Sequence, residues 1–269
     1  MNSDFTVIYA AVGDKYLLEC LTSIKSLLRF HDSIPVKVLT CGQESKAKSI
    51  FAPYPNVTVE DLYSDVKNMG LNPGYAMEAS RGLKISVISR CGSDIGIFLD
   101  TDTYICKPID RFAEKINESP FGVVLTNEPA AAHVDTGSDR PNATQLLKLS
   151  QDKFFNSGVY GFRKNESTLG FEEKWKRIFL DQKDDTTSSE WRRLCDQTAF
   201  NAALSKYDPT GFIVLSNTIW NAQCKILNEL KFQDRLKDVA IIHCKLMHAY
   251  DADIEKVVQS EYVKRFRLP

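Results

Sequence analysis

Two carboxylates, Asp100 and Asp102, directly follow the strongly apolar segment IGIFL at residues 95–99. If the chain is extended there, residues i and i+2 point to the same side. The two carboxylates would then lie within about 4 Å of each other and repel by roughly 4 kcal/mol at an effective dielectric constant near 20. A divalent cation removes this cost, and hard oxygen ligands suit Mg²⁺ or Mn²⁺, which bridge to phosphates. The triplet therefore predicts a metal and phosphate site, with a solvated turn of helix-capping aspartates as the alternative.

The elements around this triplet indicate the fold class. Short apolar segments alternate with amphipathic helices, which predicts βαβ units and a mixed, mostly parallel central sheet flanked by helices. Ligands in open α/β sheets collect beyond the carboxyl ends of strands, and Asp100 and Asp102 lie at such an end. Strands are expected at residues 5–11, 35–40, 56–60, 95–99, 121–126, 154–162, 212–215 and 239–243, and helices at residues 17–28, 77–90, 171–180, 192–206 and from 254 onward.

The composition excludes several classes of protein. The 269 residues contain 34 Lys and Arg against 35 Asp and Glu, a net charge of −1 that argues against binding nucleic acid through a basic surface. A 43% apolar content with 15 Phe, 10 Tyr and 3 Trp argues against disorder. We expect no membrane span and no secretory signal, and the seven scattered cysteines fit reduced thiols in a cytoplasmic protein.

Four short motifs occur in series along the chain. The first is AAVGDKY at residues 10–16, and the second is the Asp100 triplet, preceded by a helix with Arg81 and Lys84. The third is FNSGV at residues 155–159, and the fourth is Asp196-Gln197 followed by Asn201. Their order resembles that of the GT-A fold nucleotide-diphospho-sugar glycosyltransferases, and it is most similar to the glycogenin-like and bacterial lipopolysaccharide galactosyltransferase-like retaining group.

This resemblance implies a single Rossmann-like GT-A domain over residues 1–269, with a nucleotide-binding part at about 1–125 and a sugar and acceptor part at about 126–269. It implies metal-dependent transfer of a sugar, with retention, from a nucleotide-diphosphate donor, expected to be a UDP-sugar, to an unidentified glycan, protein or lipid acceptor. A long loop at residues 127–144 is expected to help shape the acceptor site.

The resemblance also assigns roles to individual residues. Each has a plain structural alternative as well: Asp196 could cap its helix, Lys84 could be solvated, and His243 could be an ordinary core histidine. The expected roles are donor binding by Ala10, Ala11, Val12, Tyr16, Arg81, Lys84, Asp100, Thr101, Asp102, Ser157 and Lys245, sugar contacts and catalysis by Asn156, Asp196 and Gln197, and binding of Mn²⁺ or Mg²⁺ by Asp100, Asp102 and His243.

The chain departs from the family pattern near its end. The family usually has H-x-x-G-x-x-K-P-W, in which His completes the metal site and Lys meets phosphate. Here the segment is IHCKLMHAY at residues 242–250, so His243 matches by its place after an apolar strand, whereas the Gly and the Lys-Pro-Trp are absent. Lys245 or His248 is left as the candidate for the phosphate contact.

Two other functions remain open from the sequence. An apolar strand followed by D-x-D-x-[TV] is the signature of haloacid-dehalogenase-like phosphatases, although Tyr104 stands where Thr or Val is expected and the signature normally opens the chain. A non-catalytic sugar-nucleotide or glycan-binding protein on the same fold would also fit the altered segment after His243. Such a protein would bind nucleotide or glycan without transferring sugar to water or to an acceptor, so a transfer assay distinguishes it from an enzyme.

Overall fold

The computed structural model describes residues 5–128, 154–181, 196–223, 226–227, 229–230 and 233–243. Seven strands form one sheet in the order β3-β2-β1-β4-β7-β6-β8, and β5 pairs with β9 in a second, small sheet. The strands are β1 (Phe5–Ala10), β2 (Val36–Thr40), β3 (Val57–Asp61), β4 (Ile95–Leu99), β5 (Thr103–Ile105), β6 (Val123–Asn127), β7 (Phe155–Arg163), β8 (Ile213–Leu215) and β9 (Ile241–His243).

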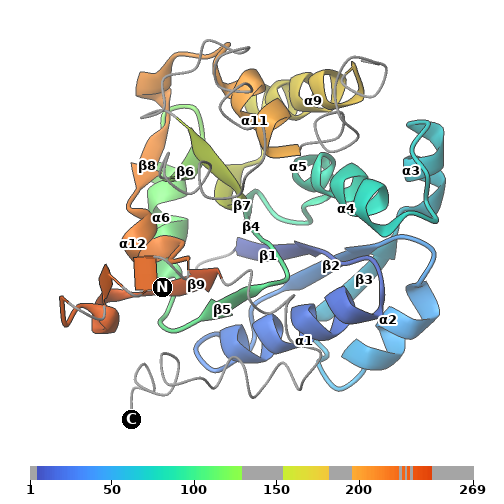
Figure 1. The fold of residues 1–269 in the computed structure, drawn as a ribbon, viewed down its shortest axis with the longest axis horizontal. Coiled ribbons are helices and arrows are strands. Elements are labelled where there is room, and N and C mark those ends of the chain that lie inside the picture. Colours follow the sequence, from blue (N-terminus) through green and yellow to red (C-terminus); the bar gives the residue numbers. More distant parts are fainter. Residues whose placement is uncertain are drawn as a thin grey trace.

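The large sheet is mixed because β7 runs antiparallel to both of its neighbours, β4 and β6. The pairs β1·β2, β1·β4, β2·β3 and β6·β8 are parallel. A mixed, mostly parallel sheet flanked by helices (Figure 1) is the fold class predicted from the sequence, and this prediction is confirmed.

Helices cover both faces of the sheet (Figure 1). The predicted amphipathic helix after β1 is confirmed as α1, whereas α2 and α6 are helices that the sequence analysis did not anticipate. The α-helices are α1 (Asp14–Leu28), α2 (Glu44–Phe51), α3 (Tyr63–Asn68), α4 (Ala76–Lys84), α5 (Val87–Arg90), α6 (Asp110–Glu118), α9 (Glu166–Asp181), α11 (Asp196–Leu204) and α12 (Asn217–Trp220). None of the helices described is long and apolar enough to cross a membrane.

Alternate residues of strand β1 pack into two different hydrophobic cores, one on each face of the sheet. Phe5, Val7 and Tyr9 point to the face covered by α1 and α6, and Ile8 and Ala10 point to the opposite face, as the two-residue period of a strand requires. Both cores consist of buried side chains, and Val7, Ile8 and Tyr9 of β1 are fully buried. The strand is therefore buried on both faces, which explains its continuous run of apolar and β-branched residues.

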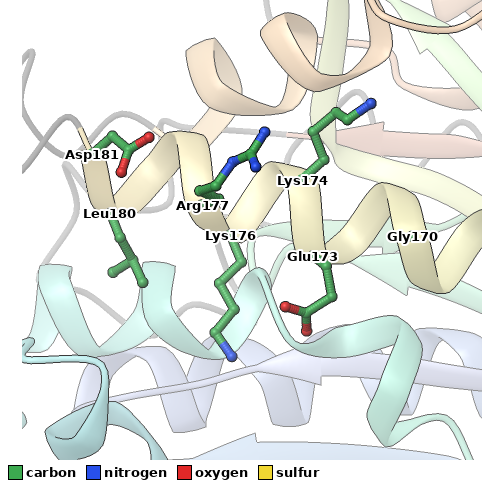
Figure 2. Close-up of a pocket in the computed structure, with 7 residues that line it drawn as sticks. All are labelled: Gly170, Glu173, Lys174, Lys176, Arg177, Leu180 and Asp181. Carbon is green, nitrogen blue, oxygen red and sulfur yellow. The ribbon is translucent and has the colours of Figure 1, made fainter.

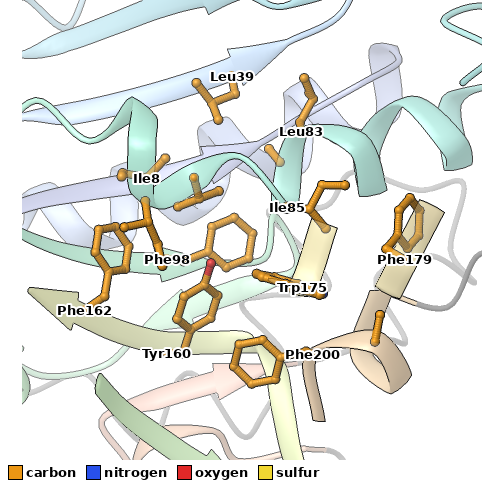
Figure 3. Packing of buried hydrophobic residues seen from close by; sticks show 14 of the residues in the cluster. Ile8, Leu39, Leu83, Ile85, Phe98, Tyr160, Phe162, Trp175, Phe179 and Phe200 are labelled. Atoms are coloured by element: carbon orange, nitrogen blue, oxygen red, sulfur yellow. The ribbon is translucent and has the colours of Figure 1, made fainter. Parts of the chain in front are cut away.

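The second of these cores contains an aromatic cluster centred on Tyr160 of β7 (Figure 3). Its ring centroid lies 5.3 Å from that of Phe98, 6.1 Å from that of Trp175 and 5.2 Å from that of Phe200. These contacts join β4, β7, α9 and α11 into one unit. The carboxyl end of β4 and the start of α11 are thereby held on the same rigid support.

The helix predicted at residues 77–90 is in fact two helices, α4 and α5, separated by Ile85 and Ser86. The Glu172 carboxylate on α9 accepts hydrogen bonds from the backbone N–H groups of Ile88 and Ser89. These are amides of the first turn of α5, which have no partner within their own helix. The break between α4 and α5 is thus stabilised by a residue of α9, and no local sequence pattern predicts it.

Burial of the Glu172 side chain raises its pKa from 4.5 to about 7, although the hydrogen bonds from Ser89 and Ile88 offset part of the shift. The folded state therefore favours the protonated acid. Its contribution to the free energy of unfolding is fully present below pH 4.5 and is lost as the pH rises through 7.

We expect Glu172→Gln to flatten the pH dependence of stability between pH 5 and pH 8, because it removes this titration while keeping an oxygen that accepts from α5. The effect amounts to a few kcal/mol. Urea unfolding at the two pH values measures it, with the exposed Glu166→Gln on the same helix as the control. An identical pH dependence in Glu172→Gln and the unmutated protein would refute this account of the α5 start.

Candidate functional site

Asp100, Asp102 and His243 come together at the carboxyl end of β4. One ligand atom from each residue lies within 4.8 Å of the others. His243 Nε2 is 3.1 Å from Asp102 Oδ1 and 3.7 Å from Asp100 Oδ2. The segment from Asp100 to Asp102 is a turn rather than the extended chain expected, since the Thr103 N–H donates to the Asp100 carbonyl oxygen at 3.2 Å. The two carboxylates converge nonetheless.

The pairing of β5 with β9 in the small sheet positions His243 next to the two aspartates. In the pairing of β5 with β9, Thr103 lies opposite His243. Thr103 immediately follows Asp102, so the register sets the imidazole beside that carboxylate. The prediction that His243 joins the two aspartates is supported by this geometry, although the residues are far apart in the chain.

The donor set fits a hard divalent cation. Two carboxylates and one imidazole are ligands that Mn²⁺ and Mg²⁺ accept. Neighbouring ligands of an octahedral ion with bonds of about 2.1 Å lie about 3 Å apart, and the 3.1 Å between His243 Nε2 and Asp102 Oδ1 is of this size. Asp100, Asp102 and His243 are thus the residues that would hold the metal.

Gly158 on β7 leaves the room that this cluster needs. A Cβ atom at this position would lie 2.2 Å from Asp100 Oδ2 and 2.7 Å from His243 Cε1. The Asp100 N–H donates to the Gly158 carbonyl oxygen at 2.7 Å, so the backbones are already in contact. Only glycine allows β7 to pass this close, which gives a physical reason for the glycine in FNSGV.

Two cationic side chains from α4 face the cluster. Lys84 Nζ lies 2.9 Å from Asp100 Oδ1 and 3.1 Å from Asp196 Oδ2, and Arg81 Nε lies 3.5 Å from Asp196 Oδ1. Spaced three residues apart, Arg81 and Lys84 share one face of the helix. The structure therefore brings both predicted basic residues together with the carboxylates of the second and fourth motifs, Asp100 and Asp196.

These ion pairs shift the pKa values of the buried groups. Burial opposes the charge on Lys84, but the Asp100 and Asp196 carboxylates outweigh it and raise the Lys84 pKa above its ordinary value. Burial likewise favours neutral Asp196, yet Lys84 and Arg81 prevail and lower the Asp196 pKa to about 2. Lys84 is therefore a cation and Asp196 an anion across the physiological range of pH.

The three predicted sugar-contacting residues also lie together. Gln197 Oε1 accepts from the Ser157 N–H at 3.3 Å and from Asn156 Nδ2 at 3.4 Å. The Ser157 hydroxyl donates to Asp196 Oδ2 at 2.9 Å. Asn201, one turn after Gln197, holds the start of β7 because its amide exchanges two hydrogen bonds of 2.8 Å with the Phe155 backbone.

Glu128, just after β6, is a member of this group that the sequence analysis missed. Its carboxylate accepts from Asn156 Nδ2 and, at 3.3 Å, from Gln223 Nε2, and only 3% of the residue is exposed. The signal that could have found it is its place directly after a predicted strand. A carboxylate behind Asn156 fixes which way that amide faces.

The remaining predicted donor residues lie at the rim of the site or elsewhere. Tyr16 is half-buried, and its pKa is raised by burial and then by the charges of Glu19 and Asp102. The Thr101 hydroxyl turns away and donates to Glu19 on α1 at 3.4 Å.

The strand end at residues 10–12 is buried, and the Ala11 N–H already donates to Leu39 within the sheet. That amide is therefore used by β2, and the predicted donor contacts of Ala10, Ala11 and Val12 stay predictions. Lys245 and His248 lie outside the described residues, as does most of the loop at 127–144.

A separate hollow of 530 Å³ lies along α9 (Figure 2). Its described lining consists of α9 residues alone, with basic Lys174, Lys176 and Arg177 offset by acidic Glu173 and Asp181. None of these side chains belongs to the cluster around Asp100. The mixed charge favours no particular ligand.

We expect Gly158→Ala to weaken Mn²⁺ binding, because the new methyl group must displace Asp100 or His243. The reduction should be about tenfold or more, as for disturbed ligand geometry in other metal sites. Gly170→Ala on α9 is the matched control, since no atom outside the immediate chain lies within 4 Å of its added Cβ. Calorimetric titration with Mn²⁺ compares the two variants, and equal affinities would show that the cluster does not bind the ion.

Known proteins resemble this chain in structure but not in sequence. No protein-family profile and no curated protein sequence matches the chain. Solved structures do match it. The galactosyltransferase LgtC, solved with donor and acceptor sugar analogues, has a TM-score of 0.60 at 14% identity, covering 98% of this chain and 97% of its own.

Two further structures agree. The bifunctional glycosyltransferase WbbM has a TM-score of 0.63 at 15% identity, covering 99% of this chain and 51% of its own. Mouse xyloside xylosyltransferase 1 has a TM-score of 0.57 at 16% identity, covering 89% of this chain and 97% of its own. The chain therefore has the GT-A fold of nucleotide-sugar glycosyltransferases.

Proposed function

We propose that this protein is a metal-dependent glycosyltransferase that moves a sugar from a nucleotide-diphosphate donor to an acceptor hydroxyl. The observation that carries this proposal is the convergence of the Asp100–Asp102–His243 cluster with Lys84, Arg81 and the Asp196–Gln197 pair at one end of the sheet. The donor is expected to be a UDP-sugar, and the acceptor a glycan, protein or lipid. A cytoplasmic location remains a prediction.

The leaving group of such a reaction is a nucleoside diphosphate, which gains negative charge as the glycosidic bond breaks. A divalent ion on Asp100, Asp102 and His243 would neutralise that charge as a Lewis acid. Lys84 is buried and permanently cationic, and Arg81 lies next to it. Both side chains provide fixed positive charge on the same side of the site, which needs no reorganisation during the reaction.

Retention of anomeric configuration is part of the proposal. The Asp196 carboxylate is bound by Lys84, Arg81 and Ser157, and the Gln197 oxygen accepts two hydrogen bonds, so neither group is a free nucleophile. A front-face reaction, in which the acceptor hydroxyl attacks on the side the diphosphate leaves, needs no protein nucleophile. Asn156, Asp196 and Gln197 would then bind and orient the sugar hydroxyls.

The comparisons bear differently on the two alternative functions, a phosphatase and a non-catalytic binding protein. The phosphatase loses support, because the structural matches described above are glycosyltransferases of one fold. A non-catalytic binder shares this fold and this site. It is separated from an enzyme by donor turnover.

We expect Asp102→Asn to remove metal-dependent donor binding, because it eliminates a charged ligand 3.1 Å from His243 Nε2. Affinity for UDP in the presence of Mn²⁺ should fall by more than about tenfold, while affinity without metal stays the same. Calorimetry with and without Mn²⁺ measures both, and the control is Asp181→Asn, an exposed position at the end of α9. Unchanged Mn²⁺-dependent affinity in Asp102→Asn would rule out this metal assignment.

A further inference from the structure

We propose that Thr126 and Asn221 are positioning residues that fix the tautomer of His243. Directional hydrogen bonds run from the carbonyl oxygen of Val159 through both side chains to the imidazole. They place the ring proton on Nδ1 and leave the Nε2 lone pair toward Asp100 and Asp102. The consequence for metal binding rests on the proposed function, whereas the tautomer itself does not.

The direction of the chain is set at its first link. The Val159 carbonyl oxygen has no hydrogen and can only accept, and it lies 3.0 Å from Thr126 Oγ1. The Thr126 hydroxyl must therefore donate its single hydrogen to this carbonyl. The β6–β7 register shifts between Leu125 and Thr126, and such irregularities re-aim side chains next to functional sites.

The second link decides the orientation of the Asn221 amide. Asn221 Nδ2 lies 3.0 Å from Thr126 Oγ1. Because the hydroxyl hydrogen is already used, the threonine oxygen can only accept here, so the NH₂ group must face it. Asparagine N and O are usually assigned from such a network, and in this network only one assignment satisfies both partners. The Asn221 carbonyl oxygen is thus turned toward His243.

The third link places the proton on the imidazole. His243 Nδ1 lies 2.8 Å from Asn221 Oδ1. An amide oxygen can only accept, so this hydrogen bond requires the hydrogen on Nδ1 and leaves Nε2 its lone pair in the neutral ring. The Asp102 carboxylate also only accepts and favours a hydrogen on Nε2, and a cation bound between Nε2 and Asp102 removes that competition. Nε2 is the atom that lies 3.1 Å from Asp102 Oδ1. The tautomer is therefore the one that can ligate a cation at the carboxylate cluster.

Burial makes these hydrogen bonds hard to replace. Thr126, Asn221 and His243 are 0%, 1% and 2% exposed, respectively. Water cannot readily substitute for a lost partner at such positions, and an unsatisfied buried group is costly. The three side chains also come from separate parts of the chain: β6, the residue after α12, and the end of β9.

The tautomer can be measured without any metal. Imidazole ¹⁵N shifts of the metal-free protein, recorded at a pH where the ring is neutral, distinguish protonated from unprotonated ring nitrogens. We expect Nδ1 protonated and Nε2 unprotonated in the unmutated protein, and a mixture of tautomers in Thr126→Val. The opposite tautomer in the unmutated protein would overturn the proposal.

Metal affinity tests the role of the hydroxyl. Thr126→Val has nearly the same shape without the donor and should bind Mn²⁺ about 10- to 100-fold more weakly, as for other partners of metal-ligating histidines. Thr126→Ser keeps the hydroxyl and should retain the affinity. Thr40→Val is the matched control, because Thr40 is also a buried strand threonine and, within the described structure, its hydroxyl has no hydrogen-bond partner.

The outcomes separate this proposal from the proposed function. Equal Mn²⁺ affinity in Thr126→Val and Thr126→Ser would overturn the positioning role. A protein that shows the expected tautomer but binds no Mn²⁺ would refute the metal assignment of the proposed function. In that case the ¹⁵N shifts of Thr126→Val still decide the positioning role. If Thr126→Val does not fold, the shifts of the unmutated protein and of Thr126→Ser provide the test.

Discussion

Charge balance among three carboxylates at one end of the sheet is the constraint on which this structure depends. Asp100, Asp102 and Asp196 converge where like charges repel, and the site holds them only with cations between them. Lys84 lies within 3.1 Å of two of these carboxylates, and the pKa of Asp196 falls to about 2 as a result. The cluster with His243 has the donor set for a divalent ion to complete the balance.

The fold satisfies this constraint with rigid supports. Antiparallel β7 passes so close to Asp100 that only Gly158 fits, and the β5–β9 register sets His243 beside Asp102. The aromatic core around Tyr160 ties β4 and β7 to the helices that carry Trp175 and Phe200. Substrate charge would therefore meet a preorganised arrangement, which is the arrangement that stabilises charge most effectively.

Much of this arrangement could be predicted from the sequence because it follows local patterns. The apolar run of β4 and the aspartates after it are visible in a few residues, and so is His243 at the end of a late strand. The interruption at Ile85 was not predictable, since it depends on Glu172 from another helix. Nor were the roles of Asn221 and Glu128 predictable, since they arise from hydrogen bonds to residues far apart in the chain: Asn221 bonds the His243 imidazole, and Glu128 bonds the Asn156 amide.

The proposed function requires this site to use a metal ion when it breaks the bond between a sugar and a nucleoside diphosphate. The most direct measurement is release of nucleoside diphosphate from UDP- and GDP-sugars, with water or added glycans as acceptor. We expect release that requires Mn²⁺ or Mg²⁺, stops when the metal is chelated and resumes when it is restored. Metal-dependent binding of a nucleotide sugar without release from any donor would refute the proposed transferase activity and identify the protein as a binding protein on this fold.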